Sequence, residues 1–405
     1  MTYHYDFDTV IERRGTGCLK VDALGERFGR DDIRPMWIAD MDFAVAPAIL
    51  QALTERLTHP ILGYPSISES YFRSIITWAD RRHGLAFNRD EVCFIPGVVR
   101  GIAYAVNYFT RPGEGVIIQP PVYHPFKMVI EGNQRRAVVN PLVLDVSTHR
   151  YSMDLTLLEQ QMADPTVTMM VLCNPHNPSG IQWDAETLAA VAAMARRHGV
   201  VVVSDEIHGD LMLWGMKHIP FLSVSDDARA VGIMLAAPSK TFNIPGLVSS
   251  WMVVKSPALR DGFYRWMEAN EFSDPMLLAM VATEAAYNEA EDWLDELINY
   301  LQDNFIAVEK MLGEEFAERD VRSMRPDASF LGWLDFTRLG REQQDLVDMI
   351  INHAGLALND GEMFGTEGRG FMRLNVASPR QVVLDSVERI VNAVKKVANP
   401  LNCKL

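Results

Sequence analysis

Cysteine is scarce in this sequence, and long hydrophobic runs are missing. The scattered positions of the 4 cysteines match neither a disulfide framework nor a zinc knuckle, so we expect no metal site. No apolar run approaches the roughly 18–20 residues that a membrane-spanning helix requires. The N-terminal segment is acidic and lacks the apolar stretch of a secretion signal. We therefore expect a cytoplasmic protein with no membrane partner. The cysteines are Cys18, Cys93, Cys173 and Cys403.

Positive charge is sparse as well. The chain has 38 Lys and Arg residues against 53 Asp and Glu residues, which gives a formal net charge of −15 at pH 7. No basic block is longer than a pair such as Arg13-Arg14. Because nucleic-acid phosphates require a positive surface, we expect no nucleic-acid partner. The glycine-rich signatures of P-loop proteins and of dinucleotide-binding proteins are also absent.

The 405 residues are enough for two domains, and between about residues 90 and 255 short apolar runs alternate with helical segments. These runs are apolar throughout, which is typical of strands whose two sheet faces are both covered by helices. The pattern predicts an α/β fold with a large, doubly wound, mostly parallel sheet, in which sites form at the carboxyl ends of strands. The predicted strands are 91–95, 115–119, 168–173, 200–204, 231–236 and 248–254.

The pattern changes after about residue 285. A long amphipathic helix at 289–312, followed by short strands at 330–336 and 370–376, predicts a smaller α+β domain. The first 50 residues carry no strong periodic element. We expect three segments, namely an N-terminal arm that forms part of the small domain (1–50), the large domain (51–285) and the C-terminal small domain (286–405).

Three chemically different side chains follow predicted strands. Asn177 lies in Asn-Pro-His-Asn-Pro-Ser-Gly, Asp205 follows the run 200–204, and Lys240 lies in Ser-Lys-Thr-Phe-Asn-Ile-Pro-Gly-Leu. Together such groups can hold a pyridoxal phosphate ring: the amine forms a Schiff base with the aldehyde, the carboxylate keeps the ring nitrogen protonated, and the amide bonds the ring hydroxyl. Each residue alone is a weak signal, because turns often carry Asp and Asn and surfaces often carry Lys.

Further phrases extend the pattern: Met-Trp-Ile-Ala-Asp-Met-Asp-Phe at 36–43, Gly-Tyr-Pro at 63–65 and Ser-Asp-Glu-Ile-His-Gly-Asp-Leu at 204–211. With the motifs above, they resemble the fold-type I pyridoxal-phosphate enzymes of the class I/II aminotransferase superfamily. More narrowly, they resemble its cystathionine β-lyase (C–S lyase) branch. The resemblance runs nearly end to end. It implies a homodimer that binds pyridoxal 5′-phosphate and releases thiol, pyruvate and ammonia from cystathionine or another S-substituted cysteine.

The resemblance also implies a role for each matching residue. Lys240 is the catalytic residue, because it carries the cofactor and removes the substrate α-proton. Tyr64 reaches the phosphate of the neighbouring subunit. Arg373 clamps the substrate α-carboxylate with its planar fork, and the backbone around Ala39 and Asp40 closes over the same group. The predicted cofactor-binding residues are Lys240, Asp205, Asn177, His208, Tyr123, Gly97, Val98, Val99, Ser239 and Tyr64.

Some points stay open at this stage. His208 falls where many aminotransferases carry a tyrosine, and a structural role is the alternative. Val248 stands where aspartate-type aminotransferases carry a phosphate-binding arginine, which leaves the phosphate contacts unsettled. Two other functions remain: an aminotransferase, which shares the early chemical steps, and a regulator that binds a transcription factor through the same fold.

Overall fold

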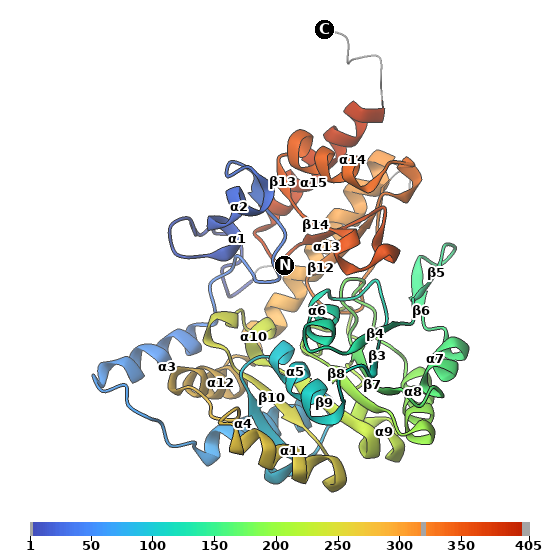
Figure 1. The fold of residues 1–405 in the computed structure, drawn as a ribbon. Coiled ribbons are helices and arrows are strands. Elements are labelled where there is room, and N and C mark those ends of the chain that lie inside the picture. The colour runs from blue at the N-terminus through green and yellow to red at the C-terminus, as the bar shows by residue number, and fades with distance from the viewer. Residues whose placement is uncertain (1–2, 317–320, 399–405) are drawn as a thin grey trace.

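The computed structural model describes residues 3–316 and 321–398, and Cys403 lies outside them (Figure 1). A seven-stranded sheet has the order β2-β10-β9-β8-β7-β3-β4. Strand β10 is antiparallel to both of its neighbours, and the other pairs are parallel. This confirms the predicted mostly parallel α/β sheet. In the same order the strands span Val92–Ile95, Ser250–Val253, Gly232–Ala236, Val201–Asp205, Val167–Cys173, Gly115–Ile118 and Arg136–Val139.

Each of the runs predicted between residues 90 and 255 contains a strand of this sheet, but two details of the sheet differ. Strand β10 begins at Ser250 instead of residue 248, because Val248 adopts a left-handed conformation with φ 50° that ends the preceding turn. Strand β4 was not predicted. It lies at the edge of the sheet, starts with Arg136 and is only partly buried, so its sequence lacks the continuous apolar signal of the central strands.

Helices cover both faces of this sheet, as the apolar strands predict. In β7, Met169 and Val171 pack into one hydrophobic cluster, whereas Met170 and Leu172 pack into the other. The helices on the first face are α5 (Val98–Phe109), α6 (Pro125–Gly132) and α11 (Pro257–Ala269). Those on the second are α4 (Glu69–His83), α7 (Leu155–Met162), α8 (Ala185–His198), α9 (Asp226–Val231) and α12 (Leu277–Glu289).

A second, antiparallel sheet lies beside the first and has the order β11-β12-β15-β14 (Figure 1). It accounts for the predicted short strands. The predicted helix 289–312 is α13, which begins two residues later, after α12 has ended. The bounds are β11 (Arg322–Ser323), β12 (Leu331–Asp335), β14 (Asn359–Asp360), β15 (Phe371–Asn375), α13 (Glu291–Phe316), α14 (Gln343–Asp348) and α15 (Arg380–Ala398).

The N-terminal segment lies against the C-terminal part of the chain, where β1 (Arg34–Pro35) pairs in parallel with β13 (Leu356–Ala357). Across residues 3–316 and 321–398, no helix has the length and apolar character needed to cross a membrane. The remaining α-helices and strands are α1 (Leu19–Asp22), α2 (Leu24–Phe28), α3 (Pro47–Thr58), β5 (Val143–Asp145), β6 (Arg150–Ser152) and α10 (Pro238–Thr241).

Candidate active site

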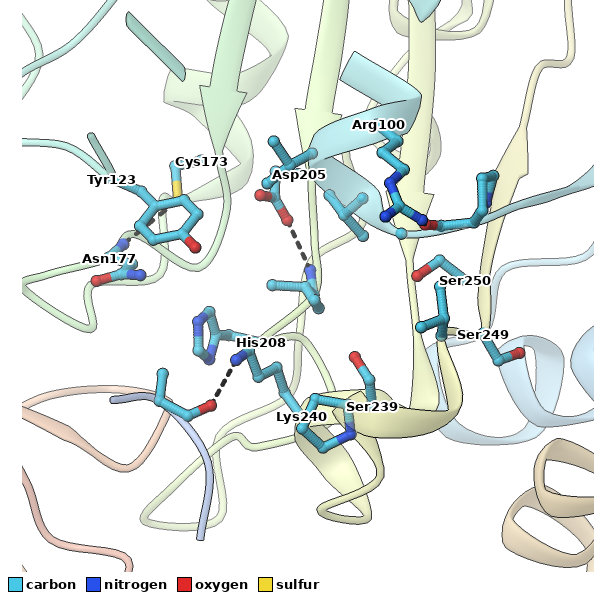
Figure 2. A pocket seen from close by; sticks show the side chains of 18 residues that line it. Arg100, Tyr123, Cys173, Asn177, Asp205, His208, Ser239, Lys240, Ser249 and Ser250 are labelled. Atoms are coloured by element: carbon cyan, nitrogen blue, oxygen red, sulfur yellow. Dashed lines mark hydrogen bonds between the residues drawn. The ribbon is translucent and has the colours of Figure 1, made fainter. Parts of the chain in front are cut away.

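A cavity of about 300 Å³ lies at the carboxyl edge of the parallel strands (Figure 2). Its size is at the lower end of the range that is usual for small-molecule sites. In open α/β sheets, sites form beyond the carboxyl ends of the strands, which we call the strand-end rule, and this rule explains the position of the cavity. A predicted residue follows or ends each of the strands β2, β3, β7, β8 and β9 at this edge. The predicted residues that line it are Ala39, Gly97, Val98, Val99, Tyr123, Asn177, Asp205, His208, Ser239 and Lys240.

One end of the cavity is formed by the start of α5. Gly97 precedes this helix with φ 115°, a conformation that side-chain-bearing residues rarely adopt. The turn therefore brings the first backbone N–H groups of α5, at Val98 and Val99, to the cavity wall. Such groups have no partner within the helix, and together with the helix dipole they favour an anion.

Lys240 is held on the short helix α10, directly after β9. Its Nζ donates to the carbonyl of Ala39. The next residue, Thr241, donates to Asp210 over 2.8 Å, and Asp210 also accepts from Trp78 over 2.9 Å. Burial lowers the pKa of the Lys240 amine to about 8, and the nearby charge of Arg373 acts in the same direction. The neutral, nucleophilic share of this amine near neutral pH is therefore much larger than that of an ordinary lysine.

Asp205 is the last residue of β8 and is buried. Burial raises the pKa of its carboxyl to about 7. One oxygen accepts from the backbone N–H of Ile207 over 3.1 Å. A buried carboxyl with so little hydrogen bonding is costly to ionise, and a cationic N–H group in the cavity would stabilise its charged form.

The neighbouring side chains are neutral. Burial lowers the pKa of the His208 imidazole to about 3, and its Nδ1 lies 3.0 Å from Oγ of Ser329. Burial also raises the pKa of the Tyr123 phenol. Cys173 lines the cavity too, and its sulfur accepts from the backbone N–H of Asn177. The sequence reasoning missed Cys173 as a cavity residue, although its place at the end of a predicted strand was a usable signal.

Arg373 lies just beyond Asn177 and does not line the cavity itself. Its guanidinium is buried and donates to Asn177 Oδ1 over 3.0 Å and to Asn359 Oδ1 over 2.7 Å. It also donates to the carbonyl of Trp37, whereas its Nε is buried without a partner. Within the described chain all of these acceptors are neutral. A buried guanidinium with only neutral acceptors is suited to bind a carboxylate that enters the site.

The segment 36–43 forms another wall of the cavity through Ala39. Asn375, on β15, donates to the carbonyls of Ile38 and Asp40 over 2.6 Å each. Asn243, which follows α10, accepts from Met41 N over 2.9 Å. The backbone of this segment is thus hydrogen-bonded both to the antiparallel sheet β11-β12-β15-β14, called the small sheet below, and to the turn that follows α10, the helix that carries Lys240.

Two further predicted residues, Asp40 and Tyr64, do not line the cavity. The side chain of Asp40 pairs with Arg13 over 2.7 Å and with Lys20 over 3.7 Å, and its charge partly offsets the lowering of the Lys240 pKa. Tyr64 is fully exposed on the loop between α3 and α4. Neither observation tests the role that the resemblance implies for these residues.

Several lining residues were not among the predicted ones. Arg100, on the first turn of α5, Ser249, just before β10, and Ser250, its first residue, lie on the same side of the cavity (Figure 2). Strand β10 is antiparallel, so it brings its first residues, not its last, to this edge. The strand-end rule for parallel strands therefore overlooks them.

The sheet order and this strand-end site define a fold-type I, aminotransferase-like α/β protein. The model of the family aminotransferase class I and II matches residues 36–390. The chain belongs to this family.

Three similar proteins narrow the relationship. The chain is 42% identical to cystathionine beta-lyase PatB of Bacillus subtilis (strain 168), over 96% of this chain and 100% of that protein. It is 36% identical to protein MalY of Escherichia coli (strain K12), over 97% and 100%. The crystal structure of cystalysin from Treponema denticola, which contains a pyridoxal 5′-phosphate cofactor, matches with a TM-score of 0.92 and 31% identity, over 97% of this chain and 99% of that one.

Proposed function

We propose that this protein is a pyridoxal-phosphate-dependent carbon–sulfur β-lyase that acts on cystathionine or another S-substituted cysteine. The observation that carries this proposal is the 42% identity to a cystathionine beta-lyase over 96% of the chain. The cavity is independent support for the cofactor, because it is lined by the buried amine of Lys240, whose pKa is lowered, and by the buried carboxyl of Asp205, whose pKa is raised. These groups suit an aldehyde and a protonated ring nitrogen.

The residues of the chain take distinct parts in this reaction. Arg373 binds the substrate carboxylate and so fixes which bond at Cα faces the cofactor. Lys240, once freed by the substrate amine, takes the α-proton on its Nζ. When bound, the cofactor supplies an electron-withdrawing ring that stabilises negative charge at Cα. Asp205 keeps the proton on the ring nitrogen, and the α5 amides hold the phosphate. The thiolate leaves from the β-carbon.

Transamination is the competing reaction, since it shares the removal of the α-proton. The two outcomes are separated by incubating the purified, cofactor-loaded protein with cystathionine and measuring pyruvate and free thiol. We expect equal amounts of both, without any added keto acid. The alternative outcome is that a keto acid forms only when an acceptor keto acid is added and that no thiol is released. This outcome would show that the protein is an aminotransferase. A panel of S-substituted cysteines then identifies the preferred leaving group.

We also propose a homodimer in which Tyr64 completes the cavity of the partner. The loop that carries Tyr64 is unusually apolar for an exposed segment, with Ile61 66%, Leu62 61% and Tyr64 106% exposed. A second copy of the chain is the occupant that would bury these side chains, and apolar patches of this kind mark interfaces.

Mixing two defective variants tests this arrangement. Lys240→Ala lacks the amine, and Tyr64→Ala lacks the phenol that reaches across. If the site is shared, each mixed dimer regains one intact cavity, and a refolded 1:1 mixture recovers about a quarter of the native activity. The assay is run at a cofactor concentration at which Tyr64→Ala alone is mostly unloaded. Recovery no greater than the average of the two separate variants would show that Tyr64 acts within its own chain, or not at all.

We further infer two properties of the whole chain, namely a cytoplasmic location and a division into domains near residues 50 and 285. The scattered cysteines, which match no disulfide framework, support the cytoplasmic location, which is the first of these inferences. The pairing of β1 with β13 supports the second, because it joins the N-terminal arm to the C-terminal part of the chain.

A further inference from the structure

We infer that Arg100 binds the cofactor phosphate and supplies the positive charge that this chain lacks at Val248. The inference rests on the proposed cofactor, and it adds a contact that the sequence motifs do not contain. Arg100 lines the cavity together with Gly97, Val98 and Val99, at the end where the first amides of α5 lie.

The charges around the cavity create the need for such a residue. A phosphate monoester carries about −1.5 to −2 charges at neutral pH. The charged side chains that line the described cavity are Arg100, Asp205 and Lys240. Lys240 is committed to the aldehyde, and Asp205 has the same sign as the phosphate. His208 is neutral, because burial lowers its pKa to about 3. Among the residues that line the described cavity, Arg100 is therefore the positively charged side chain that is left to bind the phosphate.

The position of Arg100 fits this role. It is the third residue of α5, and helical side chains lean toward the N-terminus of their helix. Its Nη1 donates to the carbonyl of Pro96 over 3.0 Å, which folds the guanidinium back over the turn that precedes the helix. Figure 2 shows Arg100 on the side of Ser249 and Ser250, away from Tyr123 and Asn177.

The guanidinium has donors to spare. It carries five N–H groups, and the bond to Pro96 uses one of them. The side chain is exposed, so it can turn toward a phosphate without unfolding its surroundings. Its exposure also limits the gain, because water and salt screen the pair. We expect its removal to weaken phosphate binding about tenfold, at the lower end of the range for charge-assisted hydrogen bonds.

The test compares two ligands that differ only in the phosphate. Cofactor-free protein is titrated with pyridoxal phosphate and with pyridoxal, and the dissociation constants are measured from the visible absorbance that forms when Lys240 binds the aldehyde. Arg100→Ala should raise the constant for pyridoxal phosphate about tenfold and leave that for pyridoxal unchanged. Arg100→Lys should restore part of the loss, since it keeps the charge.

Arg111→Ala is the matched control, because it removes one exposed arginine just after the end of the same helix. It should leave both dissociation constants unchanged. The inference is overturned if Arg100→Ala changes neither constant, changes both equally, or behaves like Arg111→Ala. A native protein that binds neither ligand would overturn the proposed cofactor, and Arg100 with it, whereas native binding with an unaffected Arg100→Ala variant overturns Arg100 alone.

Discussion

Lys240→Ala is expected to abolish both the visible absorbance of the cofactor-loaded protein and its lyase activity. The absorbance arises because a lysine amine condenses with the cofactor aldehyde, and alanine offers no amine. We expect the activity to fall because, in the proposed reaction, the same Nζ takes the α-proton, and removing a positioned general base costs on the order of 10²–10⁴-fold in rate. Absorbance spectra and pyruvate release, measured on the same preparation, check the two effects together.

The loss should not come from unfolding. The Lys240 amine is buried and its pKa is lowered to about 8, so its charged form is disfavoured in the fold, and alanine removes that cost. We expect the melting temperature of the cofactor-free variant to be equal to or above that of the native protein. Lys217→Ala, which changes an exposed lysine outside the cavity, should leave spectrum and rate intact. A Lys240→Ala protein that keeps both signals would show that another amine carries the cofactor.

Asp205→Asn is expected to have opposite effects on activity and on the stability of the cofactor-free protein. The amide keeps the shape of the side chain but has no charge to hold a proton on the ring nitrogen. We expect the lyase rate to fall by about a hundredfold or more, as when one preorganised electrostatic contact is removed elsewhere. Pyruvate release under saturating substrate and cofactor measures this effect.

The stability effect follows from the raised pKa of Asp205. Its pKa is about 7 in the folded, cofactor-free protein and close to 3.8 in the unfolded chain. The folded state therefore binds more protons between these values, and its stability falls as pH rises from about 4 to about 7. Asparagine removes this loss, which amounts to roughly 4 kcal/mol at most for a shift of this size.

Thermal unfolding of the two cofactor-free proteins gives the measurement. The melting temperatures should be nearly equal at pH 4 and should differ most at pH 8, where Asp205→Asn is the more stable protein. Saturating cofactor should reverse the order at pH 8, because the ring nitrogen then pairs with the native carboxylate. An equal difference at both pH values would mean that the carboxyl of Asp205 is not the titrating group.

Much of this architecture could be predicted because buried parallel strands leave a strong signal. The apolar runs located the central strands, and the strand-end rule placed Asn177, Asp205 and Lys240 at one edge. Strand β4 was not predicted because it is partly exposed and its apolar run covers only residues 137–139. Arg100 was not predicted as a cavity residue because the sequence does not show which side of α5 faces the cavity unless the turn at Gly97 is known.

Other parts of the site depend on contacts between segments that are distant in sequence. The Asp40 carboxylate forms ion pairs with Arg13 and Lys20, and no local pattern predicts that cluster. The place of Arg373 behind Asn177 depends on how β15 meets the large sheet. The roles of the individual site residues, the dimer and the domain limits stay predictions.

The segment 36–43 couples the position of the Lys240 amine to the small sheet. Its carbonyls are tied to Asn375 on one side, and the carbonyl of Ala39 receives the Nζ of Lys240 on the other. A displacement of the small sheet would therefore move the carbonyl of Ala39, which accepts the hydrogen bond from the Nζ of Lys240.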